Sequence, residues 1–222
     1  MTKKEVVAIK ELKYRTVELE IEGLTPLIEH AWDEKAKRMI LDAEQKKKKG
    51  KEHEYKNPVL DFINSLYWLE GKPEITADMK EDEEACEAAF MKAMENGAKF
   101  GFPIKGLKDA AVSAAYRMGW TKDKVSARGA FFVTGATTDF IEIEGKPEMR
   151  EDMVRVGMGS ADIRYRGEFK TWRAKLSLEY CENGQFDLES IIAMINAGGR
   201  VCGIGEMRPE KGGQNGQFRI VA

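Results

Sequence analysis

Cysteine and histidine are scarce in this sequence, with three and two residues respectively among 222. The cysteines, Cys86, Cys181 and Cys202, are an odd number and include no C-x-x-C pair. This pattern argues against a disulfide framework and against a structural zinc site. We therefore expect the protein to work without a metal ion and without a cofactor.

Long apolar runs are also missing. No stretch approaches the roughly 20 apolar residues that a membrane-spanning helix needs. The amino-terminal MTKKEVVAIK has no long apolar core of the kind found in signal peptides. We expect a cytoplasmic protein that makes no contact with a membrane.

Neither sign of charge is in large excess, because 36 basic and 38 acidic residues give a net charge of -2. This balance argues against a protein that covers its whole surface with nucleic acid. The charges are unevenly distributed, however. Residues 163–175 (IRYRGEFKTWRAK) contain five cations and one acid, with three aromatic residues between them. This segment is the best candidate in the sequence for a basic, aromatic face.

The pattern of hydrophobic residues predicts both strands and helices. Hydrophobic residues make up 42% of the chain, which is enough for a core in one domain. Alternation predicts strands at 16–21 and 171–180, the second with a basic outer face and with Trp172 in the core. Helical spacing predicts a helix at 107–118 and another at 188–198, which Asp187 begins and Gly198 ends. Further strand-like runs are 130–136, 139–145 and 217–221, and 148–167 is a hairpin candidate.

The order of these elements predicts an α+β fold. Without residues 32–97 the order is strand, helix, strands, helix, strand, which is the split βαβ pattern of the ferredoxin-like fold, also used by RNA-recognition modules. We expect one domain over residues 1–222, with a helical insertion at 32–97 and a projecting β-hairpin at 146–167. Within the insertion, Asn57 and Pro58 predict a helix start, and a second helix is expected to end at Gly97.

A glycine-rich segment lies near the carboxyl end, where residues 196–221 contain seven glycines, three arginines and one lysine. A Walker loop requires Gly-Lys-Ser/Thr, but Lys211 is followed by two glycines. A dinucleotide-binding loop requires a third glycine where Arg208 stands. The segment therefore matches neither of these phosphate-binding loops.

Three segments together resemble the RAMP superfamily, which includes the backbone subunits of CRISPR effector complexes. They are EGLTPLIEH (22–30), FPIKGLKDAAVSAAYR (102–117) and AGGRVCGIGEMRPEKGGQNGQF (197–218). More closely, the chain resembles a group of uncharacterised bacteriophage and prophage proteins that have TPLLMH early, RPRF..W before a strand and GIG..RPE..G.FG.F at the end. This resemblance implies the cytoplasm of a bacterial host. The segment FPIKG lacks the paired serines of the CRISPR form.

The resemblance implies a non-enzymatic protein that binds single-stranded nucleic acid and assembles side by side on it through head-to-tail contacts between copies. In this interpretation the glycine loop brings backbone N–H groups against the phosphodiester chain while nearby cations neutralise it. The expected nucleic-acid-binding residues are Lys105, Lys108, Arg155, Arg164, Tyr165, Arg166, Phe169, Lys170, Arg173, Lys175, Arg200, Gly203, Gly205, Arg208 and Lys211. Tyr165 and Phe169 are the expected stacking residues.

Other functions remain open at this point. Some RAMP proteins cleave RNA, so His30, with Asp33, is a candidate catalytic residue of an endoribonuclease. The chain could also be a phage factor that binds and blocks a host protein complex, because a fold alone does not determine function. The sequence does not distinguish DNA from RNA, since both offer phosphates and stackable bases.

Overall fold

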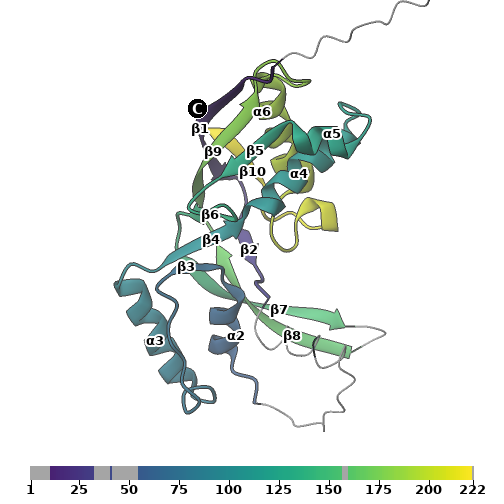
Figure 1. Cartoon of the computed structure of the whole chain (residues 1–222). Helices are drawn as coiled ribbons and strands as arrows, with labels where there is room; N and C mark the ends of the chain where they lie inside the picture. Colours follow the sequence, from purple (N-terminus) through teal and green to yellow (C-terminus); the bar gives the residue numbers. More distant parts are fainter. Residues whose placement is uncertain (1–10, 33–40, 42–54, 157–159, 222) are drawn as a thin grey trace, which may run out of the picture.

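The structure is a computed structural model that describes residues 11–32, 41, 55–156 and 160–221. It is a mixed α+β protein in which the strands of the described residues form three antiparallel sheets (Figure 1). None of the described helices has the length and apolar character needed to cross a membrane.

The largest sheet has the strand order β10-β1-β9-β5, and every pair in it is antiparallel. Helices α4 and α6 connect its strands and lie with α5 on one side of it (Figure 1). The bounds of these elements are β1 (Tyr14–Gly23), α4 (Ile104–Arg117), α5 (Lys124–Gly129), β5 (Phe131–Thr134), β9 (Arg173–Cys181), α6 (Leu188–Ala197) and β10 (Phe218–Val221).

Two smaller sheets form the rest of the described protein. One has the order β3-β4-β6 and the other the order β2-β8-β7. Their strands are β2 (Leu27–Glu29), β3 (Trp68–Glu70), β4 (Lys99–Pro103), β6 (Phe140–Ile143), β7 (Pro147–Val156) and β8 (Ser160–Phe169). The expected hairpin is formed by β7 and β8, which pair from Pro147↔Phe169 to Val156↔Ser160. The strand-like runs on either side of Gly135 fall in different sheets, because β5 pairs with β9 and β6 pairs with β4.

The region expected to be a helical insertion is packed into the core. It contains α2 (Pro58–Ser65) and α3 (Glu83–Glu95), and also strand β3. The ring centres of Trp68 and Phe100 are 4.8 Å apart, and those of Phe100 and Phe169 on β8 are 5.7 Å apart. Aromatic contacts therefore join the insertion to the β7–β8 hairpin.

Local signals placed four helix ends correctly. The side chain of Asn57 accepts a hydrogen bond from the Leu60 amide at the start of α2, and Asp187 accepts one from the Ser190 amide at the start of α6. Helix α3 ends just before Gly97, whose φ is 76°. Helix α6 also ends where expected, at Ala197 with Gly198 as its cap residue, but the φ of Gly198 is -54° and not positive, and the chain continues into a π-helical turn, η1 (Gly198–Cys202).

The alternation in β9 is confirmed, with Ala174, Leu176, Leu178 and Tyr180 buried under the helices. Trp172 is also buried, and its indole N–H donates to the Thr25 carbonyl at 3.0 Å. The opposite side of the sheet carries no helix in the described part of the chain (Figure 1). We call it the open sheet face.

Candidate nucleic-acid interface

The three segments that resemble the RAMP superfamily meet around one cavity of about 220 Å³. They lie far apart along the chain, at 22–30, 102–117 and 197–218, yet each contributes lining groups. The lining residues are His30, Tyr67, Phe102, Gly106, Asp109, Ala110, Gly203, Ile204, Gly205, Glu206, Arg208 and Glu210. We call this space the central cavity.

The glycine loop reaches the central cavity by packing closely against the segment that contains β2. The Glu206 amide donates to the Ile28 carbonyl at 2.9 Å, and the Gly216 amide donates to the Pro26 carbonyl at 2.7 Å. A Cβ atom at Gly205 would lie 2.5 Å from the Ile28 carbonyl oxygen. Glycine is therefore required here by contacts within the protein.

Most amides of the glycine loop donate to carbonyl groups of the protein. The Ile204 amide donates to Gly216, the Gly213 amide to Arg208 and the Asn215 amide to Met207, at distances of 2.9 to 3.1 Å. These groups are not free to bind a phosphate. The expectation that the loop as a whole forms a phosphate cradle is therefore wrong for these amides, and the loop acts mainly as a wall of the central cavity.

The three cations expected in this loop differ in their surroundings. Arg208 spans the loop, since its Nη1 donates to the Gly205 carbonyl at 3.0 Å and its Nη2 bonds Glu210 at 3.0 Å. Arg200 and Lys211 are exposed. Arg208 thus holds the loop together, while the other two side chains reach the surface.

The acidic groups of the central cavity are each paired with a cation, which is exposed for Asp109 and Glu210 and buried for Glu206. Asp109 contacts Lys105, and Glu210 contacts Arg117 at 2.9 Å. Glu206 has a longer ion pair, 3.9 Å, with Arg166. The carboxylate of Glu206 is therefore the least neutralised of the three.

A buried carboxyl group, that of Glu29, lies next to the central cavity. Its side chain is fully buried, and its Oε2 accepts a hydrogen bond from the Tyr67 amide at 3.0 Å. Among the described residues none donates to its Oε1. Burial raises the pKa of Glu29 well above its ordinary value, and burial together with Glu29 and Glu206 raises the pKa of Tyr67.

The catalytic alternative rests on His30, which lines the central cavity near Tyr67. Asp33, its expected companion, lies outside the described residues. No group of three or more histidine, cysteine and acidic side chains in the described part could hold a metal ion.

Two of the residues expected to bind nucleic acid on the β7–β8 hairpin are buried. Phe169 is fully buried and packs on Phe100, so its ring has no free face for a base. Arg166 is 3% exposed and its Nη1 donates to Asp152 at 3.1 Å. Both residues belong to the core, contrary to the expectation, because α2 and the glycine loop cover the base of the hairpin.

The other expected hairpin residues are nearer the surface. Arg155 is exposed, and Arg164 lies 3.5 Å from Asp162. Tyr165 is half-buried and its hydroxyl is hydrogen-bonded to Glu151, which raises the pKa of Tyr165. Only part of the predicted aromatic, basic segment is therefore available to a ligand.

The open sheet face is not the basic face that the alternation in β9 predicted. Arg173 lies 3.4 Å from both Glu20 and Glu22 of β1. Lys175 lies 3.5 Å from Glu144. Lys170, at the end of the hairpin, contacts Glu148 in the same way. These cations are paired with carboxylates that come from other strands.

A basic surface lies instead on the helical side of the sheet, over α4 and α5. Residues 104–129 contain six cations and two acids. The side chains of Tyr116 and Trp120 are 49% and 46% exposed among them. The cations are Lys105, Lys108, Arg117, Lys122, Lys124 and Arg128. We call this set of six cations and two aromatic residues the helical basic surface.

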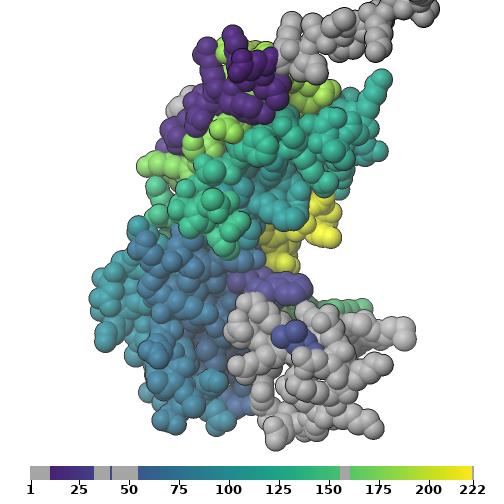
Figure 2. All heavy atoms as spheres, in the orientation of Figure 1, coloured from purple at the N-terminus to yellow at the C-terminus, as the bar shows by residue number. Residues whose placement is uncertain are grey.

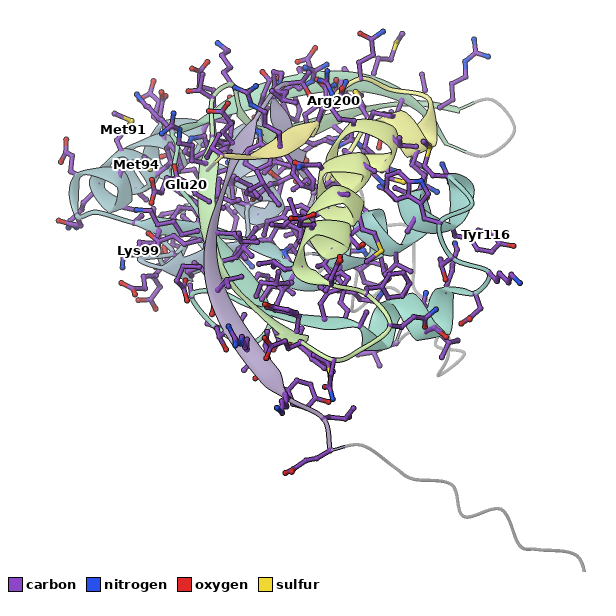
Figure 3. The ribbon with its side chains drawn as sticks, turned by 90° about the horizontal axis from the view of Figure 1, so that it is seen from above. Glu20, Met91, Met94, Lys99, Tyr116 and Arg200 are labelled. Atoms are coloured by element: carbon purple, nitrogen blue, oxygen red, sulfur yellow. The ribbon has the colours of Figure 1, made fainter. Side chains whose placement is uncertain are left out.

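The helical basic surface adjoins the glycine loop and faces away from the open sheet face. Figure 2 shows the teal helical region directly above the yellow carboxyl-terminal loop. Figure 3 shows Tyr116 pointing outward on one side of the molecule, with Glu20 of β1 on the other. The Nζ of Lys124 lies 5.4 Å from the centre of the Tyr116 ring, and that of Lys108 lies 4.6 Å from the Phe132 ring.

Sequence reasoning identified Lys105 and Lys108 of this surface but missed the other four cations and both aromatic residues. The signal was present in YRMGWTKDK (116–124), where three cations and two aromatic residues surround one acid. The strong alanine pattern of α4 indicated packing on the sheet and said nothing about the outer side of the helix. The alanines of α4 pack on the sheet, and the cations lie on the outer side of the same helix.

Comparison with models of known protein families found no match to this chain, and comparison with curated protein sequences found no significant match.

Proposed function

We propose that the protein is a non-enzymatic, RAMP-like protein that binds single-stranded DNA or RNA and assembles side by side on it. The observation that carries the proposal is the helical basic surface, where cations exceed acids by six to two and two aromatic side chains are exposed. Cations neutralise phosphates, and exposed aromatic rings stack on bases without sequence preference. The central cavity, where the three RAMP-like segments meet, adjoins this surface.

The arrangement of the large sheet supports the same proposal. Its order β10-β1-β9-β5, with α4 and α6 as connections, corresponds to the 4-1-3-2 order of a split βαβ unit. We therefore propose a ferredoxin-like fold. The binding surface differs from that of an RNA-recognition module, because the cations on the open sheet face are paired with glutamates. On the helical side Lys105, Arg117 and Arg128 are paired too, but cations outnumber acids there.

Removing two cations from the helical basic surface is expected to weaken binding. We choose Lys122→Gln with Arg128→Gln, because both side chains are exposed and the ion pair of Arg128 with Asp109 is long, at 3.9 Å. Fluorescence anisotropy with a labelled single-stranded 20-mer should show lower affinity at low salt. The slope of log affinity against log salt concentration should fall by about 0.7 for each phosphate that the variant no longer neutralises.

The matched control removes two cations from the open sheet face, Arg173→Gln with Lys175→Gln. Because these cations are paired with glutamates, the control should bind nearly as well as the unchanged protein. A weaker control and an unaffected helical variant would place the interface on the open sheet face instead. If no oligonucleotide changes the anisotropy at low salt, the proposal is wrong. RNA should also stay intact in these mixtures, and metal-free cleavage that disappears in His30→Ala would favour the endoribonuclease.

The outer part of the β7–β8 hairpin is the proposed contact between neighbouring copies. Met153 is 81% exposed and Ile163, its cross-strand partner, is 42% exposed. Deleting residues 149–162 of the hairpin would remove Asp152 and leave Arg166 buried without its nearest carboxylate. The milder change Met153→Ser with Ile163→Thr is expected to abolish cooperative binding while leaving binding of a single copy intact.

Light scattering on a single-stranded 60-mer measures this effect, since cooperative assembly gives fully covered strands at partial saturation. Met91→Ser removes a comparably exposed apolar side chain, 46%, on α3 and serves as the control. If the unchanged protein binds the long strand as independent copies, the assembly proposal fails even where binding is confirmed.

A further inference from the structure

The walls of the central cavity combine flat apolar surfaces with acidic groups. The ring of Tyr67 lies at 5.9 Å from that of Phe102, and both residues line the cavity with Ala110 and Ile204. Glycine backbone at Gly106, Gly203 and Gly205 keeps side chains out of the remaining wall. Such a lining suits a flat ring system held by a few polar groups.

The volume of the central cavity limits the size of its ligand. About 220 Å³ is below the roughly 300 to 1,000 Å³ of pockets that enclose drug-sized ligands. The cavity has room for one ring system and not for several linked ones.

The charges in the central cavity oppose a phosphate and favour hydrogen-bond donors. Ionised carboxylates only accept hydrogen bonds, and three of them, Asp109, Glu206 and Glu210, line the space beside a single arginine. Asp109 contacts Lys105, and Glu210 contacts both Arg117 and Arg208. Among the described residues Glu206 has only the 3.9 Å pair with Arg166. Glu206 therefore keeps the most capacity to accept new hydrogen bonds.

We propose that the central cavity binds one nucleobase of the bound strand through an edge that carries an amino group. This inference rests on the proposed function and adds a base preference to it. Bases of single strands are commonly read by aromatic walls and by hydrogen bonds to their Watson–Crick edges, and carboxylates accept hydrogen bonds from exocyclic amino groups.

The rim explains how the sugar-phosphate chain stays outside while one base enters. Arg117 bonds Glu210, and Lys105 bonds Asp109, so cations of the helical basic surface stand directly beside the cavity residues. Phosphates on either side of the inserted base would meet these cations. The acidic cavity and the basic rim thus serve different parts of one nucleotide chain.

Donor count predicts the order of preference among the bases. Guanine offers a ring N–H next to an amino group, and one carboxylate can accept a hydrogen bond from each of them. Adenine and cytosine offer an amino group beside a ring acceptor. Thymine and uracil offer one N–H between two carbonyl groups, and the oxygen atoms of those carbonyl groups are repelled by a carboxylate. Guanine should therefore bind best, and thymine and uracil worst.

The test uses the full protein and fluorescein-labelled 12-mers. The reference is all-thymine DNA, and the others carry one guanine, adenine or cytosine at the centre, with the uracil-based RNA series beside them. At low salt, the single guanine is expected to tighten binding about tenfold, in line with one good base contact. Glu206→Gln should reduce that preference at least severalfold and should not weaken binding of all-thymine DNA, because glutamine removes the carboxylate that opposes the thymine carbonyl groups.

Glu179→Gln changes an exposed carboxylate on β9 and is the control, with the preference for guanine expected to remain. Thermal melting establishes that both variants fold. Equal binding of all 12-mers by the unchanged protein would overturn the inference while leaving the proposed function intact, and this result does not depend on any variant. Loss of binding to every 12-mer would instead overturn the proposed function. A guanine preference that Glu206→Gln leaves unaltered would place base reading outside the central cavity.

Discussion

Replacing Gly216 with alanine is expected to prevent stable folding. The φ of Gly216 is 67°, and a Cβ atom there would lie 1.7 Å from the Ile204 carbonyl oxygen. The Ile204 amide donates to the Gly216 carbonyl at 2.9 Å, so the segments around Ile204 and Gly216 cannot move apart without losing this hydrogen bond. We expect a cost above about 4 kcal/mol, which is a large part of the stability of most domains.

Gly212→Ala is the matched control, because Gly212 lies in the same loop with a φ of 83° and has no atom within 4 Å of a Cβ. It should lose only the roughly 1 to 2 kcal/mol that a left-handed conformation costs a residue with a side chain. Thermal melting of both variants separates the two effects. Similar melting temperatures for the two would show that the loop relaxes around Gly216, in contrast to the close contact described.

Replacing Glu29 with glutamine is expected to stabilise the protein at neutral pH. Burial raises the pKa of Glu29 in the folded protein above the ordinary value of 4.5. The folded state therefore binds more protons than the unfolded state between the two pKa values. The free energy of unfolding falls as the pH rises through this window, by about 1.4 kcal/mol for each unit between them. Glutamine does not titrate, and its side-chain oxygen can still accept from the Tyr67 amide.

Melting temperatures measured from pH 4 to pH 8 check this expectation. The difference between Glu29→Gln and the unchanged protein should be small near pH 4 and should grow with pH, by about 2 to 4 °C for each kcal/mol. Glu179→Gln, an exposed carboxylate, should follow the unchanged protein throughout. Parallel curves for Glu29→Gln and the unchanged protein would mean that Glu29 titrates alike in the folded and unfolded states.

Glu29 also supports one wall of the central cavity. Its carboxyl group accepts from the amide of Tyr67, whose ring lines the central cavity. The buried carboxyl therefore helps to hold one wall of the proposed base pocket.

The candidate site was predicted only in part. The sequence singled out three segments by their glycine, proline and charged residues, but it did not predict the cavity at which they meet. The expected roles of individual residues were less accurate. Phe169 and Arg166 belong to a basic, aromatic segment of the kind that binds nucleic acid, yet both side chains are buried. Their burial depends on the elements that pack on the base of the hairpin, which sequence composition does not indicate.

The sequence by itself determined the features that depend on neighbours along the chain. Asn57 and Asp187 begin helices because each side chain accepts from an amide three residues later. The alternation of β9 decided which of its side chains are buried, because successive residues of a strand point to opposite sides. These interactions are local, so sequence spacing is sufficient to place them.

Only the tertiary structure decided which cations are neutralised and which remain for a ligand. Arg173 meets Glu20 across a separation of 153 residues, and Arg117 meets Glu210 across 93. No local spacing connects such pairs, since they form only when distant strands, helices and loops pack side by side. The helical basic surface keeps more cations than acids, even with Arg117 paired to Glu210, because α4 and α5 carry few carboxylates, whereas β1 supplies glutamates to the open sheet face.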